Sequence, residues 1–195
     1  MLQIHPVAAF RDNYFWLFHE DGDHRAWIVD PGDAGPVDAA LAARKLTLAG
    51  IVVTHHHFDH TGGVSQLART HGAGVVGPSS QEFTGVDRVL SDGDRMTLAG
   101  REFEIIEVPG HTLDHIAYHC AAEGVLFCGD TLFAGGCGRL FEGTPEQMHQ
   151  SLSRLAALPG STRIYCAHEY TLANLAFARR VEPGNEALGE REQKA

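Results

Sequence analysis

The stretch Ile51–Gly63, IVVTHHHFDHTGG, places four histidines and an aspartate within six positions directly after an apolar run. His55, His57, Asp59 and His60 form the pattern H-x-H-x-D-H. Residues two positions apart in an extended backbone point to the same side, so His55 and His57 can bind one metal ion. The chain then turns, and Asp59 and His60 face the same pocket from beyond the bend. His56 points away from its neighbours, and we expect it to pack or to support a ligand.

Three further candidate ligands each follow a later apolar run. They are His111 in IIEVPGHT, Asp130 in VLFCGDT and His168 in RIYCAHE. Seven ligands are too many for one tetrahedral zinc ion, so the set predicts two metal ions a few ångströms apart with Asp130 as a carboxylate bridge. We assign His55, His57 and His111 to the first ion, and Asp59, His60 and His168 to the second.

The remaining histidines and the cysteines are not part of such a ligand pattern. We expect the remaining histidines to be ordinary surface or core residues: His5, His19, His24, His71, His115, His119 and His149. The cysteines form no C-x-x-C pair and are expected to be small buried thiols: Cys120, Cys128, Cys137 and Cys166. Asp30, at the end of AWIVD, has two equally good interpretations, a support for a ligand histidine or a turn aspartate before Pro31.

Apolar runs and turn residues predict the elements that position these groups. We expect strands at 2–10, 13–19, 26–30, 50–54, 74–78, 87–90, 95–98, 101–110, 115–120, 124–130 and 162–168. Helical spacing predicts helices over 36–46, 61–72, 144–158, 171–181 and 186–195, with Thr144 and Asn185 as N-caps. This order predicts an α/β fold, in which two mixed sheets pack face to face with helices on the outer faces.

Composition limits the partners. The chain has 195 residues, 44% hydrophobic and 21% charged, which is typical of a soluble globular protein. We expect one catalytic domain over 1–182 and a short C-terminal segment over 183–195. The net charge of −10, without a Lys/Arg cluster, argues against nucleic acid and anionic membranes as partners. The sequence shows neither a basic leader nor an apolar run of about 18 residues, so we predict a cytoplasmic location.

The motifs THHHFDHTGG, PGHT, GDTLF and AHEYT, in that order, resemble the metallo-β-lactamase superfamily. The segments DNYFWLF, IVDPGDAGPV, GDTLFAGGCGRLFEGT and YCAHEYTLANLAFARRVEPGN are similar to glyoxalase II, the hydroxyacylglutathione hydrolases. This resemblance runs from about Ile4 to Asn185. The H-x-H-x-D-H pattern marks only the superfamily, whereas GCGRLFEGT and HEYT are more specific.

The resemblance implies a four-layer αβ/βα sandwich, two divalent metal ions, and hydrolysis of S-2-hydroxyacylglutathione, typically S-D-lactoylglutathione, to D-lactate and glutathione. It also implies that Arg139, Phe141 and Tyr170 lie against the glutathione part, with Arg139 paired with a carboxylate. Many relatives have tyrosine in place of Phe141, so one hydroxyl contact is expected to be missing. Glyoxalase II proteins usually continue as a helical domain, so we interpret 183–195 as a short remnant of it and expect weaker glutathione binding.

A binuclear site activates water. A water that bridges two dications loses a proton near neutral pH, and the hydroxide attacks a carbonyl carbon while a metal stabilises the oxyanion. We expect Asp59 and Asp130 to orient this hydroxide. A thioester suits the site because a thiolate leaves with little help from an acid. Mixed His/Asp ligation does not choose among zinc, iron and manganese, because all three accept imidazole and carboxylate. We expect zinc, with iron or manganese as alternatives.

Other functions stay open at this level. The same core could hydrolyse a lactone, a phosphodiester or a β-lactam in a cleft opened by the short C-terminus. A persulfide dioxygenase of this fold would use one iron and fewer ligands, and a metal-binding remnant would have no activity. The preferred hypothesis has a small-molecule glutathione thioester as the partner of a monomer or weak dimer.

Overall fold

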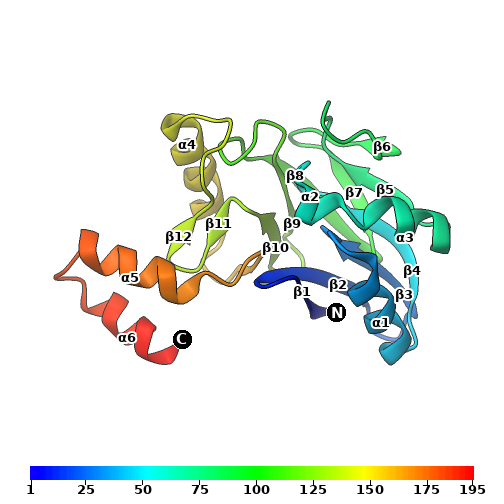
Figure 1. The fold of residues 1–195 in the computed structure, drawn as a ribbon, viewed down its shortest axis with the longest axis horizontal. Helices are drawn as coiled ribbons and strands as arrows, with labels where there is room; N and C mark the ends of the chain where they lie inside the picture. The colour runs from blue at the N-terminus through cyan, green and yellow to red at the C-terminus, as the bar shows by residue number, and fades with distance from the viewer.

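The computed structural model describes residues 1–195 and arranges them in four layers (Figure 1). One sheet has six strands in the order β1-β2-β3-β4-β5-β6, and the other has five in the order β13-β10-β9-β8-β7. Helices α1 (Ala34–Arg44) and α3 (Val64–His71) pack on the outer face of the first sheet, and α4 (Pro145–Ala156) packs on that of the second. The predicted sandwich of two mixed sheets with outer helices is confirmed.

The strands of the first sheet are β1 (Leu2–Ala9), β2 (Asn13–Glu20), β3 (Arg25–Val29), β4 (Thr47–Val52), β5 (Gly74–Gly77) and β6 (Arg88–Val89). Those of the second are β7 (Arg95–Leu98), β8 (Arg101–Glu107), β9 (Ile116–Cys120), β10 (Val125–Gly129) and β13 (Arg163–Cys166). A small hairpin, β11 (Leu132–Phe133) and β12 (Gly136–Cys137), stands apart from both sheets.

Strand direction determines which loops meet. In the second sheet β8 and β10 are each antiparallel to β9, and β13 is parallel to β10. Strands β8, β10 and β13 therefore run in the same direction, and their carboxyl ends lie at one edge. In the first sheet β3, β4 and β5 are parallel to one another. The backbone N–H of Ile116 donates to the carbonyl of Thr54 at 2.9 Å, which joins the two sheets just after β4 ends.

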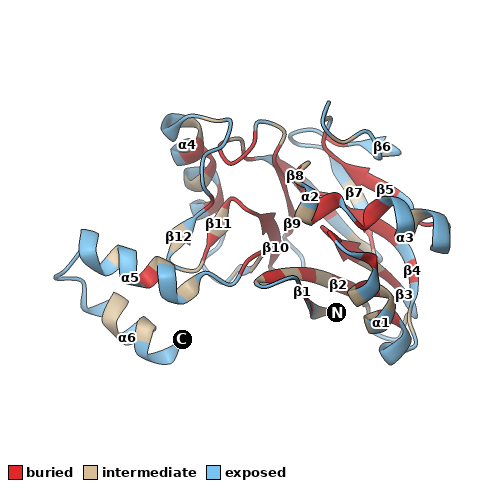
Figure 2. Ribbon diagram, viewed as in Figure 1, coloured by how far each residue is buried: buried red, intermediate tan, exposed pale blue.

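The main core lies between the sheets (Figure 2). Phe18 on β2 packs against Phe103 and Phe127 of the second sheet, with ring centroids 5.8 and 5.1 Å apart. The buried Tyr118 hydroxyl donates to the carbonyl of Val53 at 2.8 Å, which adds a polar link across this layer. Each such side chain contributes about 1.5–3 kcal/mol through burial, so the apolar layer rather than the loops holds the sandwich together.

The last two helices lie at one side of the sandwich (Figure 1). Helix α5 (Thr171–Val181) buries only Leu175, and α6 (Glu186–Lys194) buries no residue. The side chain of Asn185, predicted as the cap of α6, makes no capping hydrogen bond. Thr144, in contrast, caps α4 as predicted, because its hydroxyl accepts from Gln147 N–H while the Gln147 side chain accepts from Thr144 N–H.

Several local predictions need correction. The helix expected over 61–72 begins later, at Val64 (α3), because Gly62 and Gly63 form a turn, and an additional single-turn helix, α2 (Phe58–Thr61), precedes it. The β11–β12 hairpin was not predicted. Cys137 is exposed rather than buried, since β12 belongs to that surface hairpin, whereas Cys120 and Cys128 are buried free thiols as expected. None of the helices combines the length and apolar character needed to cross a lipid bilayer.

Candidate metal centre

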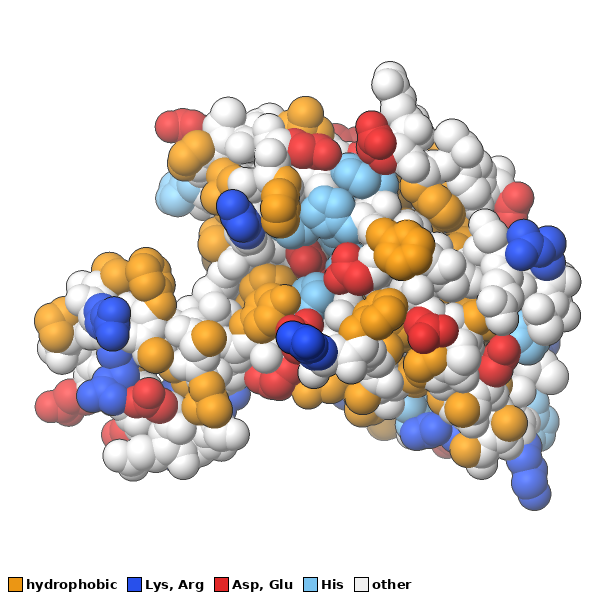
Figure 3. All heavy atoms as spheres, in the orientation of Figure 1, with side chains coloured by type: hydrophobic (Ala, Val, Ile, Leu, Met, Phe, Trp, Pro, Cys, Tyr) orange, Lys and Arg blue, Asp and Glu red, His pale blue; other side chains and the backbone are white.

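The structure brings all seven predicted ligand side chains to one edge of the sandwich. His55 and His57 follow β4, and Asp59 and His60 lie on the single turn α2. The other three follow the co-directional strands: His111 after β8, Asp130 after β10 and His168 after β13. Histidine and carboxylate side chains meet at the centre of one face of the molecule, in a hollow surrounded by apolar side chains (Figure 3).

His55, His57 and His111 form the first triad, with ligand atoms within 4.8 Å of one another. The Nδ1 atom of His57 lies 3.1 Å from His55 Nε2 and 3.0 Å from His111 Nε2. Three imidazole nitrogens pointing at one spot are poor mutual partners, because each neutral ring has a single N–H to donate. They are well suited to a cation that accepts all three lone pairs.

Asp59, His60 and His168 form the second triad. Asp59 Oδ2 lies 3.4 Å from His60 Nε2 and 3.5 Å from His168 Nε2. Asp130 lies between the triads, because its Oδ2 is 3.3 Å from both His111 Nε2 and His168 Nε2 and its Oδ1 is 3.5 Å from His60 Nε2. The position expected for a bridging carboxylate is therefore occupied by Asp130.

Three of the five histidines have Nδ1 hydrogen-bonded to an oxygen. The partner is Thr54 Oγ1 at 3.0 Å for His55, the Arg139 carbonyl at 2.7 Å for His111, and Asp12 Oδ1 at 2.9 Å for His168. In His60, Nδ1 lies 3.1 Å from Asp30 Oδ2 without forming a hydrogen bond. A proton on Nδ1 leaves the Nε2 lone pair free toward the centre. This arrangement fixes the tautomer and the ring orientation that metal ligation requires.

Asp30 lies directly behind the centre, a position that favours the first of its two interpretations. Its side chain is buried and accepts hydrogen bonds from Thr54 N–H and Thr54 Oγ1–H, both at 2.7 Å. Its backbone has φ of 52°, a conformation uncommon outside glycine, asparagine and aspartate. Gly129 on β10 meets a similar constraint, because its φ is 49° and a Cβ there would come within 2.4 Å of Thr54 Oγ1.

Several supporting residues were missed by the sequence analysis. Asp12 holds His168, and Asn13 Nδ2 donates to Asp59 Oδ2 at 2.9 Å. His115, interpreted as an ordinary histidine, is buried and stacked on His55 with centroids 4.6 Å apart, and its Nε2 accepts from Asp130 N–H at 3.1 Å. The one available signal was the polar DN pair between two predicted strands, since the other contacts depend on tertiary structure.

Burial and nearby charge shift the histidine pKa values of the two triads in opposite directions. Burial lowers the pKa of His55 well below its usual value and also lowers the pKa of His57 and of His111. Burial acts the same way on His60 and His168, but the adjacent carboxylates outweigh it and raise the pKa of both rings. Burial opposes ionisation of Asp130, yet the facing His60 and His168 rings lower its pKa to about 2. In the metal-free protein the second triad therefore retains protons more strongly.

The mouth of the centre is a cavity of about 300 Å³ lined by three of the predicted substrate contacts, Arg139, Phe141 and Tyr170. The Arg139 guanidinium lies over the Phe141 ring at 5.1 Å and makes no ion pair within the protein. The Phe141 ring packs edge-on against His57 and His111, each with centroids 5.3 Å apart. The Tyr170 ring stacks on His168 at 5.0 Å, and burial together with Asp12 raises the pKa of its hydroxyl to about 12.

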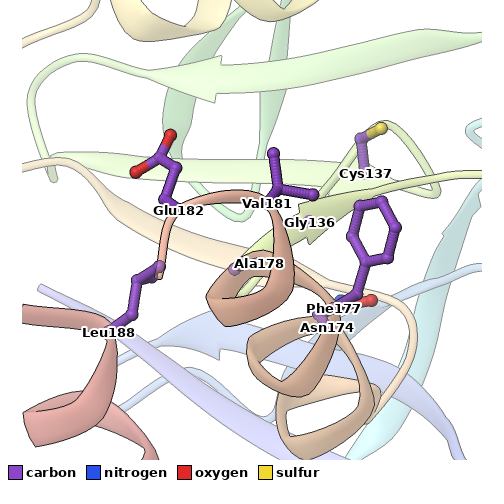
Figure 4. A pocket seen from close by; sticks show the side chains of 9 residues that line it. Gly136, Cys137, Asn174, Phe177, Ala178, Val181, Glu182 and Leu188 are labelled. Carbon is purple, nitrogen blue, oxygen red and sulfur yellow. The ribbon is translucent and has the colours of Figure 1, made fainter. Parts of the chain in front are cut away.

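A separate cavity of about 350 Å³ lies between α5, α6 and the β11–β12 hairpin (Figure 4). Phe177, Val181 and Leu188 supply most of its apolar lining, and Cys137 lies at its edge. It contains no histidine and only one carboxylate, Glu182, so it cannot hold a metal pair as the first cavity can.

The residues present fit a pair of divalent cations. Both ring nitrogens of His60 and Asp130 Oδ1 are buried without a hydrogen-bond partner, and His60 Nε2 lies 3.5 Å from Asp130 Oδ1 where the triads meet. Buried polar atoms without partners are costly, and a bound cation would remove that cost for His60 Nε2 and Asp130 Oδ1. The His/Asp clusters on this fold thus indicate a binuclear metal site.

The chain belongs to the metallo-β-lactamase superfamily, whose family model matches residues 10–168. Among solved structures, it is similar to the BLEG-1 B3 metallo-β-lactamase, at 27% identity and a TM-score of 0.75 over 87% of this chain and 92% of that one. It is also similar to TTHA1623 in a di-iron-bound form, at 28% identity and a TM-score of 0.73 over 85% of this chain and 92% of that one.

A nearer relative comes from Ectopseudomonas mendocina and is named hydroxyacylglutathione hydrolase. The two sequences are 58% identical over 98% of this chain and 75% of the relative. The identity to this relative is about twice that to the β-lactamase, which places the chain on the hydroxyacylglutathione hydrolase side of the superfamily.

Proposed function

We propose that this protein hydrolyses the thioester of S-2-hydroxyacylglutathione, typically S-D-lactoylglutathione, at a pair of divalent metal ions. The observation that carries the proposal is the convergence of two triads on Asp130, with Nδ1 of three of the histidines hydrogen-bonded to an oxygen. The 58% identity to a hydroxyacylglutathione hydrolase supports the substrate class.

In this proposal His55, His57 and His111 hold one ion and Asp59, His60 and His168 hold the other, with Asp130 shared. Mixed imidazole and carboxylate ligands accept zinc, iron or manganese, and we propose zinc first. The di-iron-bound form of TTHA1623 supports a binuclear centre on this fold, although the metal in that structure is iron rather than zinc.

When bound, the cation pair supplies the positive charge that lowers the pKa of a water molecule and stabilises negative charge on a carbonyl oxygen. Asp59 stays ionised, since His60 and Asn13 lower its pKa despite burial. Asn13 occupies Oδ2 of Asp59, so Oδ1 is left to accept a hydrogen bond from a water in the cavity and to orient it. The leaving thiolate of a thioester needs little protonation, which agrees with a cavity that offers no carboxylic acid with a raised pKa.

Substrate binding is assigned to the cavity mouth. Arg139 has no internal carboxylate partner and can pair with a carboxylate of the glutathione part. Tyr170 remains a neutral phenol at physiological pH because its pKa is about 12, so its hydroxyl can donate to substrate. Phe141 offers an apolar ring that is 59% exposed, which suits contact with the tripeptide backbone.

The test combines metal analysis with a substrate panel. We expect the wild-type protein to bind two metal ions and to hydrolyse S-D-lactoylglutathione, while His55→Ala and Asp130→Ala abolish turnover and lower metal content. The panel adds a lactone, bis-p-nitrophenyl phosphate and nitrocefin. Preference for one of these, or full activity of the metal-free protein, would overturn the proposal. Two bound metal ions without turnover would indicate a binding remnant.

A further inference from the structure

His56 lies inside the ligand loop but faces away from the metal centre, between two carboxylates from other loops. Its Nδ1 lies 3.0 and 3.1 Å from the two oxygens of Asp114, and its Nε2 lies 3.4 Å from Glu142 Oε1. The His56 and Asp114 side chains are only 12% and 10% exposed, and Glu142 is 35% exposed. This is a largely enclosed group rather than a set of chance surface contacts.

Both carboxylates are anchored by further hydrogen bonds. The Thr112 hydroxyl donates to Asp114 Oδ1 at 2.6 Å, and the backbone N–H of Leu113 donates to Glu142 Oε2 at 2.8 Å. The group therefore ties together three loops: the one that carries His55 and His57, the one that carries His111, and the segment 139–143.

The segment 139–143 carries the candidate substrate contacts Arg139 and Phe141. It runs beside the His111 loop, with Phe141 N–H donating to the His111 carbonyl and Gly143 N–H to the Gly110 carbonyl, each at 3.1 Å. Arg139 and Phe141 line the cavity, whereas the side chain between Phe141 and Gly143, Glu142, turns to Leu113 and His56. Glu142 thus anchors this segment on the side that faces away from the cavity.

We propose that His56, Asp114 and Glu142 form a positioning clamp that sets the segment 139–143, and so determines how tightly the glutathione part of the substrate is held. The inference rests on the proposed function for its substrate. The clamp acts through Arg139 and Phe141 and touches neither the reacting thioester nor the metal ligands' inner nitrogens. It serves substrate specificity rather than the chemical step.

The alternative role for His56, Asp114 and Glu142 is to bind a third cation, since their ligand atoms lie within 4.8 Å of one another. Their hydrogen bonds argue against this role. Asp114 already accepts a hydrogen bond from the Thr112 hydroxyl and faces His56 Nδ1. Glu142 Oε2 accepts from Leu113 N–H, and Glu142 Oε1 faces His56 Nε2. A cation would have to displace these partners, whereas the buried atoms His60 Nε2 and Asp130 Oδ1 have none.

Steady-state kinetics of His56→Gln and Glu142→Gln test the clamp with two substrates. One is S-D-lactoylglutathione, and the other is the lactoyl thioester of N-acetylcysteamine, which lacks most of the tripeptide. For the glutathione thioester we expect KM to rise about three- to tenfold, as loss of one positioning contact implies, with kcat changed less than twofold. For the truncated thioester we expect kcat/KM within twofold of wild type, and metal content of two per chain throughout.

Double variants decide whether the clamp works through the segment. In an Arg139→Ala/Phe141→Ala background, Glu142→Gln should raise KM no further, because the side chains that it positions are gone. Glu82→Gln, an exposed carboxylate in the loop before β6 with no ion pair, is the matched control and should behave as wild type. An equal loss on both thioesters, an additive effect in the double background, or a third metal ion per chain lost in Glu142→Gln would overturn the clamp.

Amide hydrogen exchange gives a readout independent of turnover. Glu142→Gln should speed exchange at Phe141 and Gly143, with little change in α1 or α3, and unchanged exchange at both amides would overturn the clamp. If the wild type hydrolyses neither thioester, the proposed function fails, and so does the role of the clamp in binding the glutathione part of the substrate. If the wild type is active but KM does not change in the variants, the clamp alone fails.

Discussion

At the scale of single residues, Asp30 shows how much the metal ligands depend on side chains behind them. One buried carboxylate accepts from both the backbone and the hydroxyl of Thr54 and faces His60 Nδ1. Thr54 in turn faces His55 Nδ1. Asp30 therefore orients one histidine in each triad, directly for His60 and through a hydroxyl for His55.

We expect Asp30→Asn to lower affinity for metal about 10- to 100-fold, because an amide NH2 cannot accept where the carboxylate oxygen does. The metal-free variant should also lose about 1–3 kcal/mol of unfolding free energy, the cost of an impaired buried hydrogen bond. Competition with a chromophoric chelator measures the affinity, and urea denaturation measures the stability. Asp21→Asn, at an exposed turn, is the control. Unchanged affinity would show that Asp30 is only a turn residue.

The two triads should respond differently to pH. The pKa values of His60 and His168 are raised in the metal-free protein, so these rings keep their protons to higher pH than a free imidazole does, and a cation must displace those protons. Affinity for the second ion should therefore increase as pH rises through those raised values and then level off. The pKa values of His55, His57 and His111 are lowered, so affinity for the first ion should vary little above about pH 6.5.

Calorimetric titration with zinc in buffers of different ionisation enthalpy counts the protons released at each step. We expect most of the release with the second ion, and less release in His168→Gln. Equal release at both steps, or second-ion affinity that falls as pH rises, would contradict the assignment of charge to the second triad.

At the scale of elements, sequence-based prediction works for features that the local sequence determines and fails for contacts that form only in the folded protein. The convergence of the seven candidate ligands was predictable, because they follow short apolar strands and strands of one direction end at one edge. The roles of Asp12, Asn13 and His115 were not, because each depends on a partner that only the folded sheets bring near. His115 illustrates the difficulty, since its contacts with His55 and with Asp130 N–H carry no sequence pattern.

The ends of elements were also harder to predict than their presence. Gly62 and Gly63 were expected to start a helix after the ligand loop, yet His60 already lies in the separate turn α2. Cys137 was expected to be buried on composition alone, but burial depends on which surface the short β12 strand occupies. The boundary between a catalytic domain at 1–182 and a segment at 183–195 stays a prediction.

Helix α5 gives an element-scale test because it is attached at few points. Leu175 is its one buried side chain, and Asn174 Nδ2 donates to the Ala134 carbonyl at 3.2 Å. We expect Leu175→Ala to lower the free energy of local opening of α5 and α6 by about 2–3 kcal/mol, with a smaller effect on global unfolding. Limited trypsin cleavage at Arg179 and Arg180 measures the opening. Leu172→Ala, at an α5 side chain that is 59% exposed and lies outside the cavity between α5 and α6, is the matched control. Equal cleavage in Leu175→Ala and wild type would show that α5 is held by other contacts.

At the scale of the whole molecule, the fold and the metal centre are energetically separable. Three clusters of 16, 14 and 6 buried apolar residues form layers between and outside the sheets, and none of them contains a candidate ligand side chain. We expect removal of metal with a chelator to abolish activity and lower the melting temperature, while the far-ultraviolet circular dichroism spectrum keeps its folded shape. Binding to the folded state alone explains the shift in melting temperature. Unfolding on chelation would show instead that the metals are structural.

The order of the ligands along the chain has a consequence for biosynthesis. His55, His57 and His111 all precede strand β10, whereas His168 follows β13, the strand that pairs with β10 in parallel. A growing polypeptide thus emerges from the ribosome with one ligand triad complete and the other still missing a member. In the proposed assignment, the second cation would gain its full ligand set only once the last strand of the sandwich is synthesised and paired, so its binding would report that both sheets are complete.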